Sequence, residues 1–380
     1  MFSICVNCVK EPRLKNLIEK YGRKRSKCHI CSRRSNKVLS AKNNGLRQLF
    51  KALIRYHYSE YEYNTHFGGD GIESLFYKEN PILEFHKNTD VLKLEEVILI
   101  LIENVYEDRV KGVSLFAGYD QNGQQNILLR ALKEDISPSL MKISERLEKE
   151  NYYNVENVMI RLLKPFKSTI GYRIPAGTRI FRARIGYKEK RIPIFGGGFY
   201  AEYHYSPYSN DEISAPPPFS AEGGRMNRPG VSFFYGATNA NTAIAEVRPH
   251  PGDKVSIGEF TSLRDLMVAD FTSTKIEPYS DSDKLLDEFQ LINSVNIVLN
   301  RVIPPTEKQQ YSLTQVIADA IRKLRYDGII FQSTAGTGHN VTIFYPELLK
   351  YSEDNEKVFT IKSIKYRIQA LDLIRGDDYF

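Results

Sequence analysis

Residues 221–250 read AEGGRMNRPGVSFFYGATNANTAIAEVRPH, and the rest of the chain is organised around this stretch. The pattern predicts a glycine-rich basic turn, a β-strand over residues 231–235 and a short capped helix that ends before Pro249. Glu246 falls at the edge of the apolar stripe of that helix, so we expect its carboxylate to be half withdrawn from water. A carboxylate there, close to a basic turn and to Tyr235, suits chemistry on an anionic substrate with an aromatic ring.

The flanking segments predict further β structure. Residues 178–184 alternate apolar and basic side chains, which is typical of a half-buried strand with Arg182 and Arg184 on one face. Residues 326–333 predict a buried strand that ends on Ser333. Other strands are expected at 256–260, 266–271, 341–345 and 358–364, with helices at 283–300 and 313–324. Residues 165–175 are interpreted as a linker, and 186–229 as a long irregular stretch forming a lid or wall.

The region before the linker has a different pattern. From residue 41 to about residue 167 the apolar residues follow helical spacing, which predicts helices near residues 46–54, 89–106, 137–147 and 155–163. We therefore expect a helical domain ahead of the β-rich part.

All four cysteines lie in two Cys-x-x-Cys pairs, Cys5 with Cys8 and Cys28 with Cys31, separated by nineteen residues. Two such pairs supply the four soft ligands of a tetrahedral zinc ion with little strain. The competing interpretations are a redox pair and free thiols. His29 lies inside the second pair, but four cysteines make it unnecessary as a ligand.

Charge is concentrated at the same end of the chain. Residues 1–47 hold 13 Lys and Arg against Glu11 and Glu19, whereas the remainder is mildly acidic. A basic zinc module can lie along the phosphates of a nucleic acid. A solvated rim around an anionic zinc–thiolate site explains the same charges equally well.

Two features bear on localisation. No run of about 20 apolar residues occurs, so we expect no membrane span. The first residues lack the basic and long apolar regions of a signal peptide, and we expect a cytoplasmic protein.

Three elements together resemble the RES family, which is named for Arg, Glu and Ser and whose toxin members cleave NAD⁺. They are the arginine strand, Glu246 on its helix and the strand that ends on Ser333; the spacing from Tyr235 to Glu246 and the Asn340–Phe344 pattern also fit. The resemblance covers roughly residues 172–346. The cysteine module with its helices is similar to a domain attached to some RES proteins.

The resemblance implies which residues act. It places the family's arginine on Arg182, with Arg184 as the fallback, its tyrosine on Tyr235, its glutamate on Glu246 and its serine on Ser333. It also implies substrate contacts from the following residues: Arg184, Arg225, Asn227, Tyr311 and Asn340.

The chemistry of NAD⁺ cleavage fits these residue types. Nicotinamide leaves as a neutral molecule, so one carboxylate, Glu246, can stabilise the oxocarbenium ion on the ribose or hold its 2′-hydroxyl. Arg182 and Arg225 suit the diphosphate, because guanidinium binds phosphate in a bidentate manner. Tyr235 can stack on nicotinamide, and Ser333 can bond the ribose or position the nucleophile.

The expected protein is α+β, with a zinc-ribbon-like module at 1–40, a helical domain at 41–168 and a RES catalytic domain at 169–380 that the resemblance implies is similar to ADP-ribosyltransferases. We expect an NAD⁺-consuming toxin of a toxin–antitoxin or phage-defence system, with phosphate as the first acceptor and water as the second. Transfer of ADP-ribose to a macromolecule is the runner-up, and a non-enzymatic nucleic-acid-binding protein is the other alternative. An antitoxin and a homodimer are among the partners considered.

Overall fold

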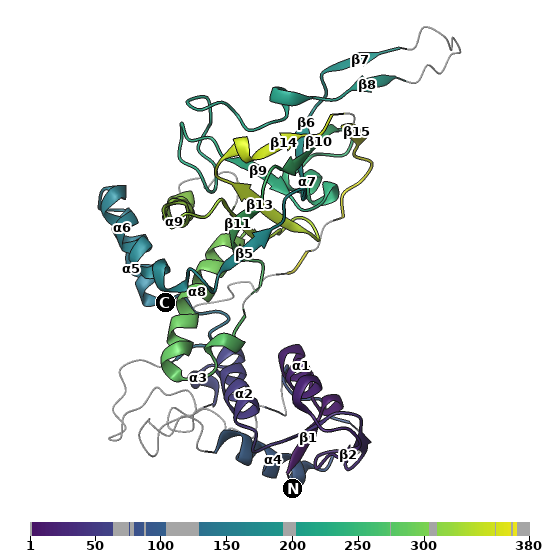
Figure 1. Cartoon of the computed structure of the whole chain (residues 1–380), viewed down its shortest axis with the longest axis vertical. Helices are drawn as coiled ribbons and strands as arrows, with labels where there is room; N and C mark the ends of the chain where they lie inside the picture. Colours follow the sequence, from purple (N-terminus) through teal and green to yellow (C-terminus); the bar gives the residue numbers. More distant parts are fainter. Residues whose placement is uncertain are drawn as a thin grey trace, which may run out of the picture. The chain divides into compact units, whose positions relative to one another are not determined.

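A computed structural model describes residues 2–63, 76, 80–86, 89–103, 129–192, 203–273, 275–303, 310–353, 355–365 and 368–370. The chain divides into two compact units. Unit 1 contains residues 1–149 and 273–299, and unit 2 contains residues 150–272 and 300–380 (Figure 1). Both helices and sheets are present, which confirms the α+β class. Among the described helices, none combines the length and apolarity that a bilayer crossing requires.

Unit 1 combines small ladders with helices. Its antiparallel pairs are β1 with β4 and β2 with β3. The elements are β1 (Ser3–Cys5), α1 (Pro12–Tyr21), β2 (Ser26–Lys27), β3 (Arg34–Ser35), β4 (Val38–Ser40), α2 (Asn44–His57), α3 (Glu60–Tyr63), α4 (Val91–Ile102), α5 (Pro138–Leu147) and α8 (Asp283–Asn300). The helix expected over residues 89–106 is α4; residues 104–106 lie outside the described part.

A buried ion cluster explains why residues 273–299 belong to unit 1. On α2, Lys51 Nζ lies 3.2 Å and Arg55 Nη1 lies 2.9 Å from the carboxylate of Asp283, at the start of α8. All three side chains are almost fully buried. A buried charge must be paired, so these contacts hold α2 and α8 together despite their separation in sequence.

Unit 2 is built on one mixed sheet. Its strand order is β14-β10-β6-β9-β13-β12-β11-β5, and β15 also pairs with β10. The strands are β5 (Gly171–Ile174), β6 (Arg179–Ile185), β9 (Phe234–Ala237), β10 (Lys254–Ser262), β11 (Leu266–Phe271), β12 (Gly328–Gln332), β13 (His339–Ile343), β14 (Leu349–Tyr351) and β15 (Lys357–Thr360). The helices are α6 (Tyr152–Leu163), α7 (Ala240–Glu246) and α9 (Tyr311–Lys323), and a separate ladder pairs β7 (Glu189–Arg191) with β8 (His204–Ser206).

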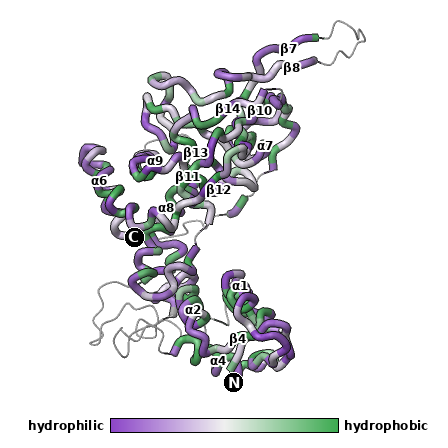
Figure 2. Tube along the Cα trace, in the orientation of Figure 1, coloured by the Kyte–Doolittle hydropathy of each residue, from purple (hydrophilic) through white to green (hydrophobic). Residues whose placement is uncertain are grey.

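Successive side chains of a strand point to opposite faces of the sheet, and apolar residues cover both faces. Figure 2 shows hydrophobic residues along the strands of this sheet. One face carries a core that includes Ile180, Phe234 and Val341. On the other face, Phe181 and Ala237 pack with the apolar residues of α7. This short helix therefore rests directly on the centre of the sheet.

The sheet has a weak seam in its middle. Within the described strands, β9 pairs with β6 only at Ala237 and Phe181, whereas it pairs with β13 over four residues. The two strands separate beyond that point. Arg182 follows Phe181, so the side chain of Arg182 lies where the β6–β9 ladder ends.

Three local predictions are wrong. The strand expected over residues 231–235 begins at Phe234, because residues 231–233 still belong to the preceding turn. The linker expected over 165–175 contains β5, an edge strand whose short sequence between prolines hides its pairing with β11. The irregular stretch expected over 186–229 contains the β7–β8 ladder, whose side chains are largely exposed and so lack an apolar alternation.

The boundaries of the three expected domains stay a prediction. The compact units differ from them in two places. Residues 273–299 join unit 1 through the α2–α8 ion cluster, and α6 joins unit 2, where it packs along α9.

Candidate active site

The carboxylate of Glu246 is the centre of a hydrogen-bond cluster. Glu246 is the last residue of α7, whose first turn is capped by Asn239, because Asn239 Oδ1 accepts the N–H of Thr242 at 2.8 Å. Glu246 Oε1 accepts a hydrogen bond from Ser333 Oγ at 2.5 Å and another from Asn340 Nδ2 at 2.9 Å. Glu246 is half-buried, as expected from its place at the edge of the apolar stripe.

The turn after β12 fixes the hydroxyl of Ser333. Its Oγ accepts the N–H groups of Ala335 at 3.1 Å and Gly336 at 2.8 Å while it donates to Glu246. The same turn is pressed against the start of α7. The N–H of Gly338 donates to Thr242 Oγ1 at 2.9 Å, and a Cβ on Gly338 would lie 2.3 Å from Asn239 Nδ2. A side chain at position 338 would therefore have to displace the amide of Asn239. The three hydrogen bonds of Ser333 Oγ orient its hydroxyl toward Glu246.

Tyr235 and Asn227 close the glycine-rich basic turn, residues 221–230. The hydroxyl of Tyr235 donates to Asn227 Oδ1 at 2.5 Å and accepts the N–H of Met226 at 3.0 Å. The Nδ2 of buried Asn227 donates to the carbonyl oxygens of Glu222 and Val231 at 3.0 and 2.7 Å. Burial raises the pKa of Tyr235, so this phenol stays protonated. Asn227 thus shapes the turn with its own amide.

Helix α9 holds the turn from the other side. Gln315 Nε2 donates to the carbonyl oxygens of Gly224 at 2.8 Å and Asn227 at 3.1 Å, and Thr314 Oγ1 donates to that of Arg225. Burial lowers the pKa of Arg225, while nearby Tyr311 and Glu246 act in the opposite direction. The Arg225 guanidinium therefore lies within electrostatic reach of the Glu246 carboxylate.

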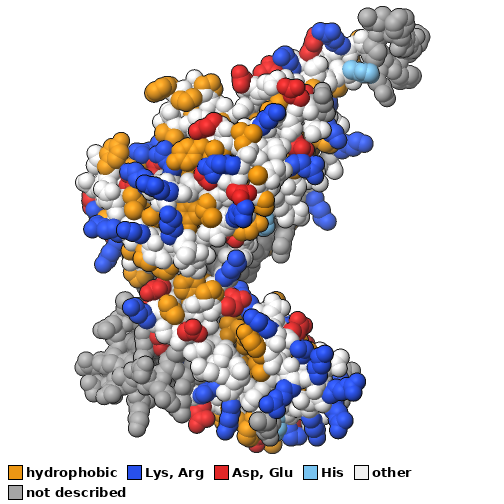
Figure 3. Space-filling view, in the orientation of Figure 1, with side chains coloured by type: hydrophobic (Ala, Val, Ile, Leu, Met, Phe, Trp, Pro, Cys, Tyr) orange, Lys and Arg blue, Asp and Glu red, His pale blue; other side chains and the backbone are white. Residues whose placement is uncertain are grey.

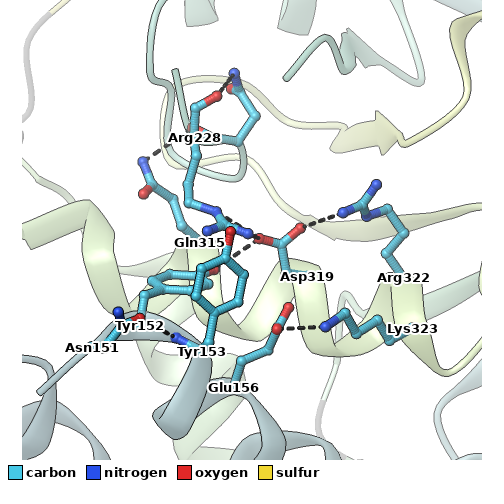
Figure 4. Close-up of polar contacts among 10 residues, drawn as sticks. Asn151, Tyr152, Tyr153, Glu156, Arg228, Gln315, Asp319, Arg322 and Lys323 are labelled. Carbon is cyan, nitrogen blue, oxygen red and sulfur yellow. Dashed lines mark hydrogen bonds and ion pairs between the residues drawn. The ribbon is translucent and has the colours of Figure 1, made fainter. Parts of the chain in front are cut away.

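An ion cluster ties α6, α9 and the basic turn into one body. Figure 4 shows buried Asp319 of α9 between two arginines; its carboxylate lies 2.9 Å from Arg228 Nη2 and 3.1 Å from Arg322 Nη2. It also accepts the hydroxyl of Tyr152 at 2.9 Å. The Arg228 guanidinium lies 3.9 Å from the centre of the Tyr152 ring, a cation–π contact. Arg228 is three residues from Arg225, so this cluster fixes the segment that carries Arg225.

The two strand arginines have different surroundings. Arg182 Nη1 donates to the carbonyl oxygen of Tyr235 at 2.9 Å, where the β6–β9 ladder ends, and burial lowers its pKa to about 10. Arg182 therefore stays charged at neutral pH. Arg184 is more exposed; it donates to the carbonyl oxygen of Glu212 and lies over the Tyr208 ring at 4.3 Å.

The structure gathers the expected residues into two groups of direct contacts. Glu246, Ser333 and Asn340 contact one another directly, and Tyr235 is linked to Arg182 through its carbonyl and to Asn227 through its hydroxyl. The contacts of Arg184, with Tyr208 and Glu212, include none of these residues.

Sequence reasoning missed the residues that support the site, among them Gln315, Asp319 and Arg228. One signal was available: Asp319 interrupts the run of residues 316–321, which is otherwise apolar, and a buried carboxylate needs cationic partners.

The cysteine pairs of unit 1 converge. Cys5 is the last residue of β1. The four buried sulfur atoms of Cys5, Cys8, Cys28 and Cys31 lie within 4.8 Å of one another. The Sγ–Sγ separations are 3.6 Å for Cys5–Cys8, 3.8 Å for Cys5–Cys31 and 3.9 Å for Cys8–Cys28. A tetrahedral ion with Zn–S bonds of about 2.3 Å requires sulfur atoms roughly 3.8 Å apart. The donor set therefore fits zinc. His29 instead contacts Glu96 at 3.0 Å.

Comparison with known proteins gives two matches. The family described as "RES domain" matches residues 198–362, a range that includes Glu246 and Ser333 but not Arg182. Among solved structures, the M. tuberculosis MbcT–MbcA toxin–antitoxin complex contains a chain that is 14% identical, with a TM-score of 0.28, over 53% of this chain and 92% of that one. No curated protein matches the sequence.

Proposed function

We propose that the RES domain, which this chain carries over residues 198–362, consumes NAD⁺ by breaking its nicotinamide–ribose bond. The observation that carries the proposal is the Glu246 carboxylate, half-buried and held by Ser333 and Asn340 through one oxygen. Two donors on Oε1 orient the group before substrate arrives, which is the preorganisation that electrostatic catalysis needs. Its other oxygen, Oε2, is the one we assign to the substrate.

The reaction requires only stabilisation of positive charge. The bond between C1′ of the ribose and the pyridinium nitrogen breaks, and its electron pair neutralises the departing nicotinamide. The positive charge moves to C1′ and the ring oxygen as an oxocarbenium ion. We assign to Glu246 the stabilisation of this ion, either directly or through the 2′-hydroxyl. An acceptor oxygen then forms the new bond to C1′ and loses its proton to solvent.

The remaining residues bind and orient. We assign the diphosphate to Arg182 and Arg225, because guanidinium matches phosphate geometry and both groups are partly desolvated. Tyr235 offers an aromatic ring for nicotinamide, and Tyr311 lies near Arg225. Ser333, Asn340 and Asn227 serve as positioning residues, since their side-chain groups are engaged within the protein. Arg184 stays a predicted substrate contact.

Phosphate is the acceptor we place first, which makes the enzyme a phosphorylase, and water is the second, which makes it a glycohydrolase. Depletion of NAD⁺ would stop growth, so we propose a toxin, and a neutralising antitoxin is the matching partner. In unit 1 we propose that the four cysteines hold a structural zinc ion with no part in the reaction.

The test is product analysis with purified full-length protein. NAD⁺ is supplied with and without millimolar phosphate, and products are identified by mass spectrometry. We expect nicotinamide together with ADP-ribose 1″-phosphate at a rate that rises with phosphate. Plain ADP-ribose at a phosphate-independent rate would make it a glycohydrolase, and ADP-ribose attached to a macromolecule would support transfer. Intact NAD⁺ with a folded protein would contradict the proposal.

A further inference from the structure

Unit 1 contains a cavity of about 750 Å³ beside the cysteine cluster. Cys28 and His29 form part of its wall, together with residues from α1, β2, β4 and α4. Its volume falls in the range of sites that take a small molecule or part of a polymer. It belongs to unit 1 alone and does not depend on the RES domain.

The wall of this cavity is cationic. Four basic side chains line it, Arg23, Lys27, Lys42 and Lys93, and none of the described residues that line it is Asp or Glu. Lys93 pairs with Asp90 at 2.8 Å. The other three cations make no ion pair with any described residue, and all three are exposed. The side chains that line the cavity therefore carry a net positive charge.

Neutral donors and an aromatic ring complete the wall. Ser26, Ser32 and Ser40 line the cavity, and serine hydroxyls commonly bond phosphate oxygens. Tyr21, at the end of α1, also lines it and is 55% exposed. An exposed aromatic ring beside a cationic groove can stack a base, and Lys20 lies 5.0 Å from the centre of this ring.

The cations continue beyond the cavity. Lys24, Arg25 and Arg33 are exposed on the turns around β2 and β3, and Arg34 is exposed on β3 itself. Figure 3 shows Lys and Arg side chains gathered over the part of unit 1 that contains α1 and β2. A free nucleotide would occupy only the cavity, whereas this surface extends along the adjoining turns. A Zn–thiolate centre with four cysteines has a net charge of about −2, which balances only a few of these cations.

We propose that this surface binds a single-stranded nucleic acid, with its phosphates along Arg23, Lys27 and Lys42 and a base against Tyr21. The exposed ring favours a single strand, because bases in a duplex are already stacked on one another. The contacts are to backbone and ring faces, so we expect little sequence preference. Binding weakens with salt as counterions are released, with a slope of about −0.7 for each neutralised phosphate.

The test is fluorescence anisotropy of labelled 12-nucleotide single strands, one of DNA and one of RNA, with the full-length protein. The Lys27→Gln/Lys42→Gln variant removes two cations from the cavity. The matched control, Lys350→Gln/Lys357→Gln, removes two exposed lysines of unit 2. We expect the cavity variant to raise Kd at least about tenfold and to reduce the salt slope by about 1.4, while the control matches wild type. Tyr21→Ala should also weaken binding.

Several outcomes would overturn the proposal. They are equal Kd values for the cavity and control variants, tighter binding of the matching duplex, and full competition by ATP at the same phosphate concentration. Circular dichroism and zinc content identical to wild type establish that each variant is folded. Nicotinamide release is measured in parallel, because this site is independent of the proposed NAD⁺ reaction and either can fail alone.

Discussion

The sharpest test of the active site is the substitution Glu246→Gln. Ser333 Oγ and Asn340 Nδ2 both donate to the same oxygen, Oε1, at 2.5 and 2.9 Å. The amide oxygen of glutamine can accept both bonds, and its NH₂ takes the place of Oε2. The variant therefore keeps the shape and the internal hydrogen bonds of the site and loses only the negative charge.

The size of the effect follows from that loss. Removing a preorganised electrostatic partner of a transition state costs about 2.7–4 kcal/mol, or roughly a hundred- to a thousandfold in kcat. The affinity for NAD⁺ should change little, because the charge on C1′ develops only in the transition state. The assay is nicotinamide release at saturating NAD⁺ and phosphate, with Glu353→Gln, an exposed glutamate of unit 2, as the matched control.

A double-mutant cycle tests whether Ser333 acts through Glu246. Ser333→Ala removes a hydrogen bond to a charged group, worth about 1.5–3 kcal/mol, so kcat should fall by about ten- to a hundredfold. If Ser333 only positions the carboxylate, the double variant should be no slower than Glu246→Gln alone. Additive losses would show that Ser333 contacts substrate. A folded Glu246→Gln protein with wild-type kcat would refute the assignment altogether.

Four further outcomes are expected. Asp319→Asn should leave Arg228 without its charged partner and loosen the basic turn, raising KM for NAD⁺ more than it lowers kcat; an unchanged KM would contradict the role of the cluster. Arg182→Ala should raise KM for NAD⁺ more than it lowers kcat in steady-state kinetics, because a diphosphate clamp binds the substrate in the ground state as well as in the transition state. Burial and the nearby Lys133 and Arg13 lower the pKa of His57 from 6.5 to about 4, so the unfolded state binds the extra proton first. Stability of unit 1 should therefore be lost as the pH falls from 6.5 toward 4, and thermal unfolding of His57→Phe should lack this slope. Cys28→Ser should abolish stoichiometric zinc and unfold the cysteine module, as measured by metal analysis and proteolysis, without stopping nicotinamide release.

Local periodicity and capping signals in the sequence were sufficient to predict the parts of the site that lie on helices and strands. The arginine strand, the capped helix of Glu246 and the strand that precedes Ser333 each have a clear period or cap, and each forms within a few residues of its expected range. Their side chains then lie close together because these strands are near one another in the sheet, in the order β6-β9-β13-β12.

Contacts between residues far apart in the chain could not be predicted from local sequence patterns. Asp283 pairs with Lys51 and Arg55 across more than two hundred residues, and no local pattern indicates which charges will be buried together. The β7–β8 ladder lacked an apolar face, so alternation could not reveal it. Gln315 lies one helical turn from Tyr311, but its carbonyl partners belong to the basic turn and are visible only once the chain has folded.

Because β6 and β9 pair at a single position, we expect the sheet to open locally along this seam. Helix α7 crosses this seam: its apolar residues pack with Phe181 and Ala183 of β6, and its Glu246 bonds to residues of the β12–β13 half. Those hydrogen bonds therefore oppose local opening as well as orienting the carboxylate. A ligand held by Arg182 on one side and by Arg225 on the other would add its binding free energy to the same closed state. Amide hydrogen exchange in β6 and β9 should then slow together when the site is filled.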